Sequence, residues 1–172
     1  MKQLIVIIGP NAVGKSTTAK KIVEQHSKCA FVDSDWCRVM NPFVLTNTTQ
    51  KLVIDNIYCL LYNYLTCKDI NTVIFTHSWH GGRREIYDCI IGKLKKEKVI
   101  FKENIIILKC SYIENERRAL IDERDINRIE RGLENTFLFY DEFNFPVFDT
   151  TRMTIQEVAE QIWDFVNKKN DL

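Results

Sequence analysis

Residues 9–16 constrain the fold of this chain more than any other segment. They read Gly-Pro-Asn-Ala-Val-Gly-Lys-Ser and match the pattern G-x-x-x-x-G-K-[ST] at every fixed position. An apolar run at 4–8 precedes them, and a helical pattern at 15–27 follows. Glycines let the backbone wrap closely around an anion, and a helix N-terminus adds unpaired N–H donors and the positive end of its dipole. The segment therefore predicts a strand, a phosphate-binding loop and a helix in succession.

The rest of the chain repeats this alternation of strand and helix. Continuous apolar runs predict strands buried on both faces, as in a parallel sheet covered by helices, at 4–8, 29–33, 72–76, 104–110 and, more weakly, 145–149. Helical patterns are found at 15–27, 50–67, 82–97, 112–131 and 154–168. The last begins with Thr154 and has Glu157 three residues on, the pattern of a capping box. The order predicts an α/β fold of three layers, with helices flanking a five-stranded parallel sheet.

Length and composition narrow the function classes. The chain has 172 residues, the usual size of one domain, so we expect 1–172 to fold as a single unit. Lys and Arg total 24 and Asp and Glu total 23, and this near balance makes nucleic acid an unlikely partner. The apolar run at 4–8 is far shorter than the roughly 20 residues of a membrane span, and no signal-peptide pattern is present. No two of the six cysteines form C-x-x-C. We therefore expect a reduced, cytoplasmic protein without a membrane partner.

The segment at 9–16 resembles the P-loop of the P-loop NTPases, and within them of the small nucleoside and small-molecule kinases. These include shikimate-kinase-like, polynucleotide-kinase-like and antibiotic-phosphotransferase-like enzymes. The resemblance implies the three-layer P-loop NTPase fold, with ATP and Mg²⁺ as cofactors. Lys15 would reach the β- and γ-phosphates as a catalytic residue, Ser16 would ligate Mg²⁺, and the backbone of Thr17 would contact the α-phosphate. The nucleotide-binding residues would be Gly9, Asn11, Ala12, Val13, Gly14, Lys15, Ser16 and Thr17.

The loop also resembles that of transporter-type ATPases in its Gly-Pro-Asn sequence. That class needs a signature helix and a Walker B acid pair after a later strand, and the sequence contains neither.

Two aspartates follow the second predicted strand, in the sequence Asp33-Ser34-Asp35. Residues two apart in a strand project to the same side, so both carboxylates could face the crevice at the carboxyl edge of the sheet. The segment resembles the Asp-x-Asp and Asp-x-x-Arg arrangements of the kinases named above. By that resemblance Asp33 would hold the Mg²⁺ water shell, Asp35 would take the proton of the acceptor hydroxyl, and Arg38 would bind the acceptor. The alternative is a turn in which the aspartates cap a short helix at Trp36–Met40.

The third predicted strand is followed by Thr76-His77-Ser78-Trp79-His80-Gly81-Gly82-Arg83-Arg84. In the kinases this segment lines the acceptor pocket, which makes Arg83 a candidate substrate ligand; the alternative is an exposed helix start. Nucleoside monophosphate kinases usually have Asp-Gly here, whereas this chain has Thr76 and His77. The spacing His77-x-x-His80 has no third ligand nearby, so we expect two neutral imidazoles lining a pocket and no zinc site.

A segment at about 112–135 is the candidate lid. Arg124, Arg128 and Arg131 fall on one helical face, where like charges repel unless an anion faces them. Small P-loop kinases close an arginine-bearing lid over the transferred phosphoryl group, so the resemblance implies catalytic roles for Arg124 and Arg128. The alternative is a solvated helix in which Glu123, Asp125 and Glu130 neutralise the arginines. After the fifth strand, Arg152 would stack on the adenine.

These features predict an ATP- and Mg²⁺-dependent kinase that phosphorylates a hydroxyl of a small molecule. A nucleotide kinase or a 5′-hydroxyl polynucleotide kinase is one alternative, and a nucleotide-binding switch with little turnover is another. The expected partners are a nucleoside triphosphate and a small-molecule acceptor. The acceptor and the oligomeric state are not specified by any motif.

Overall fold

A central parallel β-sheet organises the structure, a computed structural model that describes residues 1–42, 44, 46–122, 129, 133 and 136–168. Within these residues the sheet has five strands in the order β2-β3-β1-β4-β5, and every neighbouring pair is parallel. The strands are β1 Lys2–Ile8, β2 Cys29–Asp33, β3 Thr72–Thr76, β4 Phe101–Lys109 and β5 Val147–Asp149. This arrangement confirms the predicted fold class.

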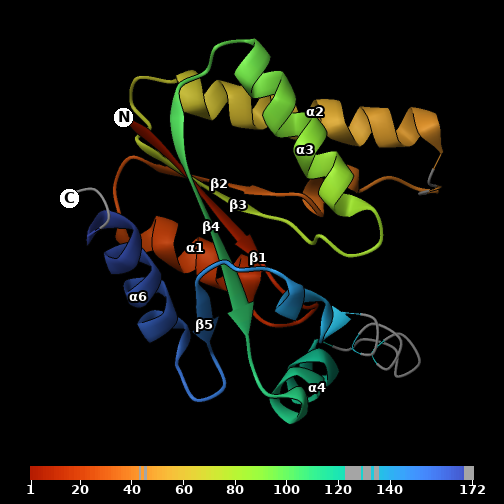
Figure 1. Ribbon diagram of the computed structural model, residues 1–172, viewed down its shortest axis with the longest axis vertical. Helices are drawn as coiled ribbons and strands as arrows, with labels where there is room; N and C mark the ends of the chain where they lie inside the picture. The colour runs from red at the N-terminus through yellow and green to blue at the C-terminus, as the bar shows by residue number, and fades with distance from the viewer. Residues whose placement is uncertain (43, 45, 123–128, 130–132, 134–135, 169–172) are drawn as a thin grey trace.

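Helices cover both faces of the sheet (Figure 1). One face packs against α1 and α6, and the other against α2 and α3. A further helix, α4, lies beyond the end of β4, and two 3₁₀ turns, η1 and η2, lie in connecting segments. The bounds are α1 Lys15–Gln25, η1 Trp36–Arg38, α2 Asn47–Thr66, α3 Arg83–Lys96, α4 Tyr112–Ile121, η2 Phe139–Glu142 and α6 Ile155–Lys168.

The central strand β1 joins the two layers of core. Its residues 4–8 are 0% exposed. Leu4, Val6 and Ile8 pack on the side of α2 and α3, whereas Ile5 and Ile7 pack on the side of α1 and α6. Burial of each such side chain stabilises the fold by about 1.5–3 kcal/mol. A continuous apolar run is therefore what this strand requires.

Several element ends differ from the predicted ones for local reasons. α2 begins at Asn47 and not near residue 50, because Thr46 and Thr49 form a reciprocal capping box. β4 begins at Phe101 and not at residue 104, because backbone pairing with β1 starts at Lys2 and Phe101 although the next side chains are polar. The capping box at the start of α6 is confirmed: the Thr154 N–H donates to Glu157, 2.7 Å, and the Glu157 N–H donates to Thr154 Oγ1, 3.2 Å.

The topology gathers the loops that follow β1, β2 and β3 at one edge of the sheet. The chain leaves β1 toward β2 and β3 on one side and later returns to β4 on the other. In open parallel sheets, ligands bind beyond the carboxyl ends of the strands at such a reversal. The segment at 9–16, between β1 and α1, lies at this point. Among the described residues, no helix has both the length and the apolar character needed to cross a membrane.

Candidate active site

The loop between β1 and α1 has a backbone that only certain residues adopt. Gly9 and Gly14 have φ of 149° and 101°, and Ala12 has φ of 61°. A Cβ added to Gly9 would clash with the carbonyl oxygen of Leu108 on β4. Glycine is therefore required at position 9 by space as well as by conformation.

Contacts from two other elements hold this loop in place. Val13 is 1% exposed and packs into the core between the sheet, α1 and α6. The side-chain amide of Asn115 on α4 donates to the carbonyl oxygen of Asn11, 2.8 Å. The Lys15 ammonium donates to the carbonyl oxygens of Gly9 and Pro10, at 3.0 and 2.7 Å. Its positive charge thus lies against the concave side of a loop that opens a helix, a combination that favours an anion.

Ser16 and Asp33 meet beside the loop. The Ser16 hydroxyl, at the start of α1, donates to Asp33 Oδ2 at the end of β2, 2.6 Å. The Asp33 side chain also accepts a hydrogen bond from the Asp35 N–H at Oδ1, 2.9 Å, and the residue is only 9% exposed. The structure therefore places a hydroxyl and a carboxylate together next to Lys15.

Asp35 is placed differently from Asp33. Strand β2 ends at Asp33, and Asp35 has the helical backbone angles of the residue before η1, so the alternation of side chains along a strand does not reach it. Its carboxylate forms an ion pair with Arg38, and its side chain is 68% exposed. It occupies the N-cap position of η1 without making a side-chain capping hydrogen bond. The predicted short helix at 36–40 is a single 3₁₀ turn.

Two histidines follow β3, and their hydrogen bonds define their tautomers. His77 Nε2 lies 2.9 Å from the Arg83 carbonyl oxygen, which can only accept, so Nε2 carries the proton. The Arg83 guanidinium donates to His80 Nε2, 2.9 Å, so in His80 the proton lies on Nδ1. Burial lowers the pKa of both imidazoles to about 4, with a further contribution from nearby cations. Both are therefore neutral at pH 7.

The cations around these imidazoles come from three separate elements, α1, η1 and α3. Lys15, Arg38 and Arg83 each lower the pKa of His80 through their charge. The Nδ1 atoms of His77 and His80 are buried and have no hydrogen-bond partner among the described residues. The edge of the sheet beside Lys15 therefore combines positive charge with unused polar atoms, which suits a polyanionic ligand with hydroxyl groups.

A hollow, which we call the α4 pocket, lies against the loop and has a volume of about 470 Å³. It is lined by Gly14 and Thr17, by Arg117 of α4, and by residues of the segment 150–155, including Met153. Arg117 is 59% exposed and is held by a paired hydrogen bond to Glu114, with both distances 2.7 Å. These two bonds and those from Arg118 lower the pKa of Glu114 to about 2.

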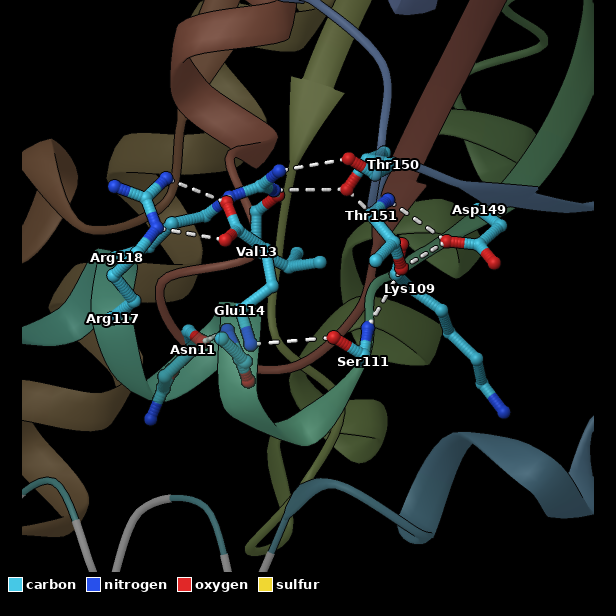
Figure 2. Close-up of polar contacts among 11 residues, drawn as sticks. Asn11, Val13, Lys109, Ser111, Glu114, Arg117, Arg118, Asp149, Thr150 and Thr151 are labelled. Carbon is cyan, nitrogen blue, oxygen red and sulfur yellow. Dashed lines mark hydrogen bonds and ion pairs between the residues drawn. The ribbon is translucent and has the colours of Figure 1, made fainter.

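Arg118 joins three parts of this wall (Figure 2). Its guanidinium donates to the carbonyl oxygen of Val13, 3.1 Å, and to the side chain and carbonyl oxygen of Thr150, 2.9 and 2.8 Å. A fourth bond runs to Glu114, 2.7 Å. Helix α4, the loop at 9–16 and the turn after β5 are therefore fixed to one another by one side chain.

The predicted site residues fall into three groups. The first group lies at the same edge of the sheet and consists of the loop residues, Ser16, Asp33, Asp35, Arg38 and Arg83. Arg152 is exposed and does not line the α4 pocket. Arg124 and Arg128 lie outside the described residues. The predicted lid and helix continue past Ile121, where α4 ends, and most of that continuation also lies outside the described residues. The sequence analysis assigned no roles to Arg117 and Arg118. The signal that bears on them is the Ser111–Glu114 cap, which places both residues on the first turns of a helix that follows a central strand.

Comparison with known proteins supports the fold. No family model matches the sequence, and no curated protein matches it by sequence similarity. A sugar kinase from Janibacter sp. HTCC2649 superposes with a TM-score of 0.65 and 13% identity, over 97% of this chain and 95% of that one. The tunicamycin resistance protein of Deinococcus radiodurans gives 0.64 and 20%, over 96% of both chains. Shikimate kinase from Bacteroides thetaiotaomicron gives 0.58 and 17%, over 96% and 98%. The chain thus has the fold of the P-loop kinases, as the sequence predicted.

Proposed function

We propose that this protein is an ATP-dependent phosphotransferase that moves the γ-phosphoryl group to a hydroxyl of a small molecule. The observation that carries the proposal is the meeting of Lys15, the Ser16–Asp33 pair and Asp35 at one edge of the sheet. Phosphoryl transfer needs little covalent chemistry from a protein and depends on positioning and on neutralising charge. This edge supplies both.

ATP would bind with its phosphates in the loop at 9–16 and its base in the α4 pocket. The Lys15 ammonium would move from the carbonyl oxygens of Gly9 and Pro10 to the β- and γ-phosphates. The Arg117 guanidinium and the Met153 side chain give the α4 pocket the planar cation and apolar surface that suit a purine. Arg83 and Arg38 would lie on the acceptor side, near the transferred group.

The residues present also fit Mg²⁺. Ser16 Oγ and Asp33 Oδ2 are oxygen donors 2.6 Å apart at the end of the phosphate loop. Mg²⁺ is usually held by one or two protein oxygens together with phosphates and waters. In the described part of the chain, no group of three or more His, Cys, Asp or Glu residues is suited to a metal. When bound, the ion neutralises charge on the β- and γ-phosphates.

Asp35 would accept the proton of the acceptor hydroxyl. The hydroxyl oxygen bonds to the γ-phosphorus, the bond from that phosphorus to the bridging β–γ oxygen breaks, and ADP leaves with the electron pair. The ion pair with Arg38 holds the Asp35 carboxylate at the carboxyl end of β2. A carboxylate in this position contributes by orienting the hydroxyl as well as by taking its proton.

An ADP-release assay over sugars, nucleosides, hydroxy acids and aminoglycosides tests the proposal. We expect at least one acceptor class to raise ADP release well above the rate with water. Lys15→Ala should lower that rate by about 10²–10³, because a preorganised charge at the phosphates is lost. Lys21→Ala is the matched control, since Lys21 is on the same helix and pairs with Glu24 on the surface. Tight nucleotide binding without stimulation by any acceptor would favour a nucleotide-binding switch.

A further inference from the structure

A large apolar hollow, which we call the β2 groove, runs beside the edge strand β2. Its volume is about 790 Å³, and its walls come from β2, from η1 with the residues after it, and from α2. The lining is mainly apolar and includes Trp36, Val39, Met40, Leu52, Leu60 and Tyr64. Lys20 and Asp33 are its only charged side chains among the described residues.

Several of these side chains are exposed in the described part of the chain. Trp36 is 71% exposed, Val39 75%, Leu52 48% and Leu60 40%. Large apolar side chains scattered singly on a surface need no explanation, but a group of them around one hollow marks a binding site. The volume lies in the range of about 300–1,000 Å³ that is usual for small-molecule sites.

The groove is continuous with the candidate active site through Asp33. Asp33 lines the groove, and its carboxylate also accepts the hydrogen bond from Ser16 at the end of the phosphate loop. The groove shares no lining residue with the α4 pocket. A nucleotide in the α4 pocket would therefore leave the β2 groove open to another molecule that reaches the same carboxylate.

We propose that the β2 groove binds the apolar body of the phosphoryl acceptor, an amphiphilic alcohol with an aromatic or alkyl group. Its hydroxyl would lie at Asp33 and Asp35, where the γ-phosphoryl group arrives, and its apolar part would extend along β2 toward α2. Most of the lining side chains are apolar, and the Asn56 amide already donates to the Cys37 carbonyl oxygen, 3.1 Å. Recognition is therefore through apolar area. The assignment of the hydroxyl rests on the proposed function.

Binding of 2-(2-naphthyloxy)ethanol, a hydroxyl compound with an aromatic body, tests the groove directly. We expect calorimetric titration to show binding, and the emission of the exposed Trp36 to change on binding. Ethylene glycol, which has the hydroxyl but no aromatic body, should bind at least about tenfold more weakly, since it buries far less apolar area. Trp36→Phe should remove the emission change while Trp79 and Trp163 remain.

Leu60→Gln should weaken binding of the naphthyl compound by about tenfold. Leu60 is 40% exposed on α2, so the variant should fold, and unchanged ATP affinity would show that it has folded. Ile100→Gln is the matched control, because Ile100 is 76% exposed and does not line the groove. Equal affinity of the parent and Leu60→Gln would overturn the proposal. So would a dimer that Leu60→Gln dissociates, because a second copy would then occupy the groove.

Transfer assays with the same variants separate this proposal from the proposed function. Binding that depends on Leu60, with no phosphoryl transfer to any alcohol, would overturn the kinase function and leave the groove as a site for an apolar ligand. If the parent and Leu60→Gln transfer the phosphoryl group to naphthyl and to compact alcohols with the same kcat/KM, the groove is not the acceptor site. The kinase function would then stand without it. We expect Leu60→Gln to raise KM for the naphthyl alcohol about tenfold with little change in kcat.

Discussion

The two aspartates after β2 show how neighbouring residues of one type come to serve different purposes. Asp33 is nearly buried and bound to Ser16, whereas Asp35 is exposed and paired with Arg38. The difference arises because β2 ends at Asp33 and the backbone turns into η1. One carboxylate is held against Ser16 at the end of the loop at 9–16, and the other is exposed beside Arg38, as the proposed roles require.

Their amide variants should consequently fail in different ways. Asp35→Asn cannot take a proton, so transfer should fall by about 10²–10⁴ while ATP affinity and the Mg²⁺ requirement stay unchanged. Asp33→Asn should raise the Mg²⁺ concentration needed for half-maximal activity, because it removes a negative oxygen ligand. Nucleotide affinity and a Mg²⁺ titration of activity, measured for both variants, check this. The same magnesium defect in both, or full transfer in Asp35→Asn, would contradict the assigned roles.

His77 should make the stability of the fold depend on pH. Its pKa is lowered to about 4 by burial, and the side chain is 3% exposed. The unfolded chain, with a pKa near 6.5, binds more protons than the folded protein between these values. The free energy of unfolding should therefore decrease as the pH falls, by about 2 kcal/mol between pH 7 and pH 5 from this residue.

Urea denaturation at pH 7, 6 and 5 measures this dependence. His77→Gln, which keeps a donor for the Arg83 carbonyl oxygen, should flatten the slope whatever its effect on stability at pH 7. His26→Gln is a control, because burial also lowers the pKa of His26. Its loss should remove only the part of the pH dependence of the free energy of unfolding that His26 contributes. An unchanged slope in His77→Gln would show that this imidazole is not held neutral by the fold.

At the scale of elements, Arg118 joins α4 both to the loop at 9–16 and to the turn after β5, whereas Asn115 reaches the loop alone. The Arg118 guanidinium makes hydrogen bonds to Val13, Thr150 and Glu114 at once, which a lysine ammonium cannot reproduce. Arg118→Lys should lower the free energy of unfolding by about 1.5–3 kcal/mol and weaken ATP binding, because the loop at 9–16 loses a support.

Thermal unfolding and nucleotide titration of this variant provide the check. Arg84→Lys is the matched control for ATP affinity. Arg84 is 55% exposed, lies 4.0 Å from Asp88 and stands over the rings of Trp79 and Phe143, and none of these contacts involves the loop at 9–16. If both variants have the same ATP affinity as the parent, Arg118 does not support the nucleotide loop.

The sheet was predictable from the sequence because burial on both faces leaves continuous apolar runs, as at residues 4–8 of β1 and at 72–76 of β3. The backbone of the loop at 9–16 was predictable because its glycines and lysine have fixed spacing. The start of β4 was not predictable, since backbone pairing extends the strand through the polar residues Lys102 and Glu103. Nor was the role of Arg118, because its partners Val13 and Thr150 are 105 and 32 residues away along the chain.

At the scale of the whole molecule, the sheet places two separate hollows near the loop at 9–16. Val13 and Gly14 of the loop line the α4 pocket, and Asp33, which is bonded to Ser16, lines the β2 groove. A nucleotide in one and an acceptor in the other would face each other across Lys15 and Ser16. A nucleotide in the α4 pocket would not block the acceptor, and an acceptor in the β2 groove would not block the nucleotide. Both can therefore be bound when transfer occurs.

The fate of the γ-phosphorus of ATP tests this account most directly. Phosphorus-31 NMR would follow ATP, Mg²⁺ and the best acceptor from the ADP-release assay until ATP is consumed. We predict that the γ-phosphorus appears as a new phosphate ester of the acceptor in an amount equal to the ADP formed, and that Lys15→Ala produces neither within the same time. If the γ-phosphorus appears only as inorganic phosphate, or if Lys15→Ala forms the ester at the parent rate, the account of this protein as a phosphotransferase is contradicted.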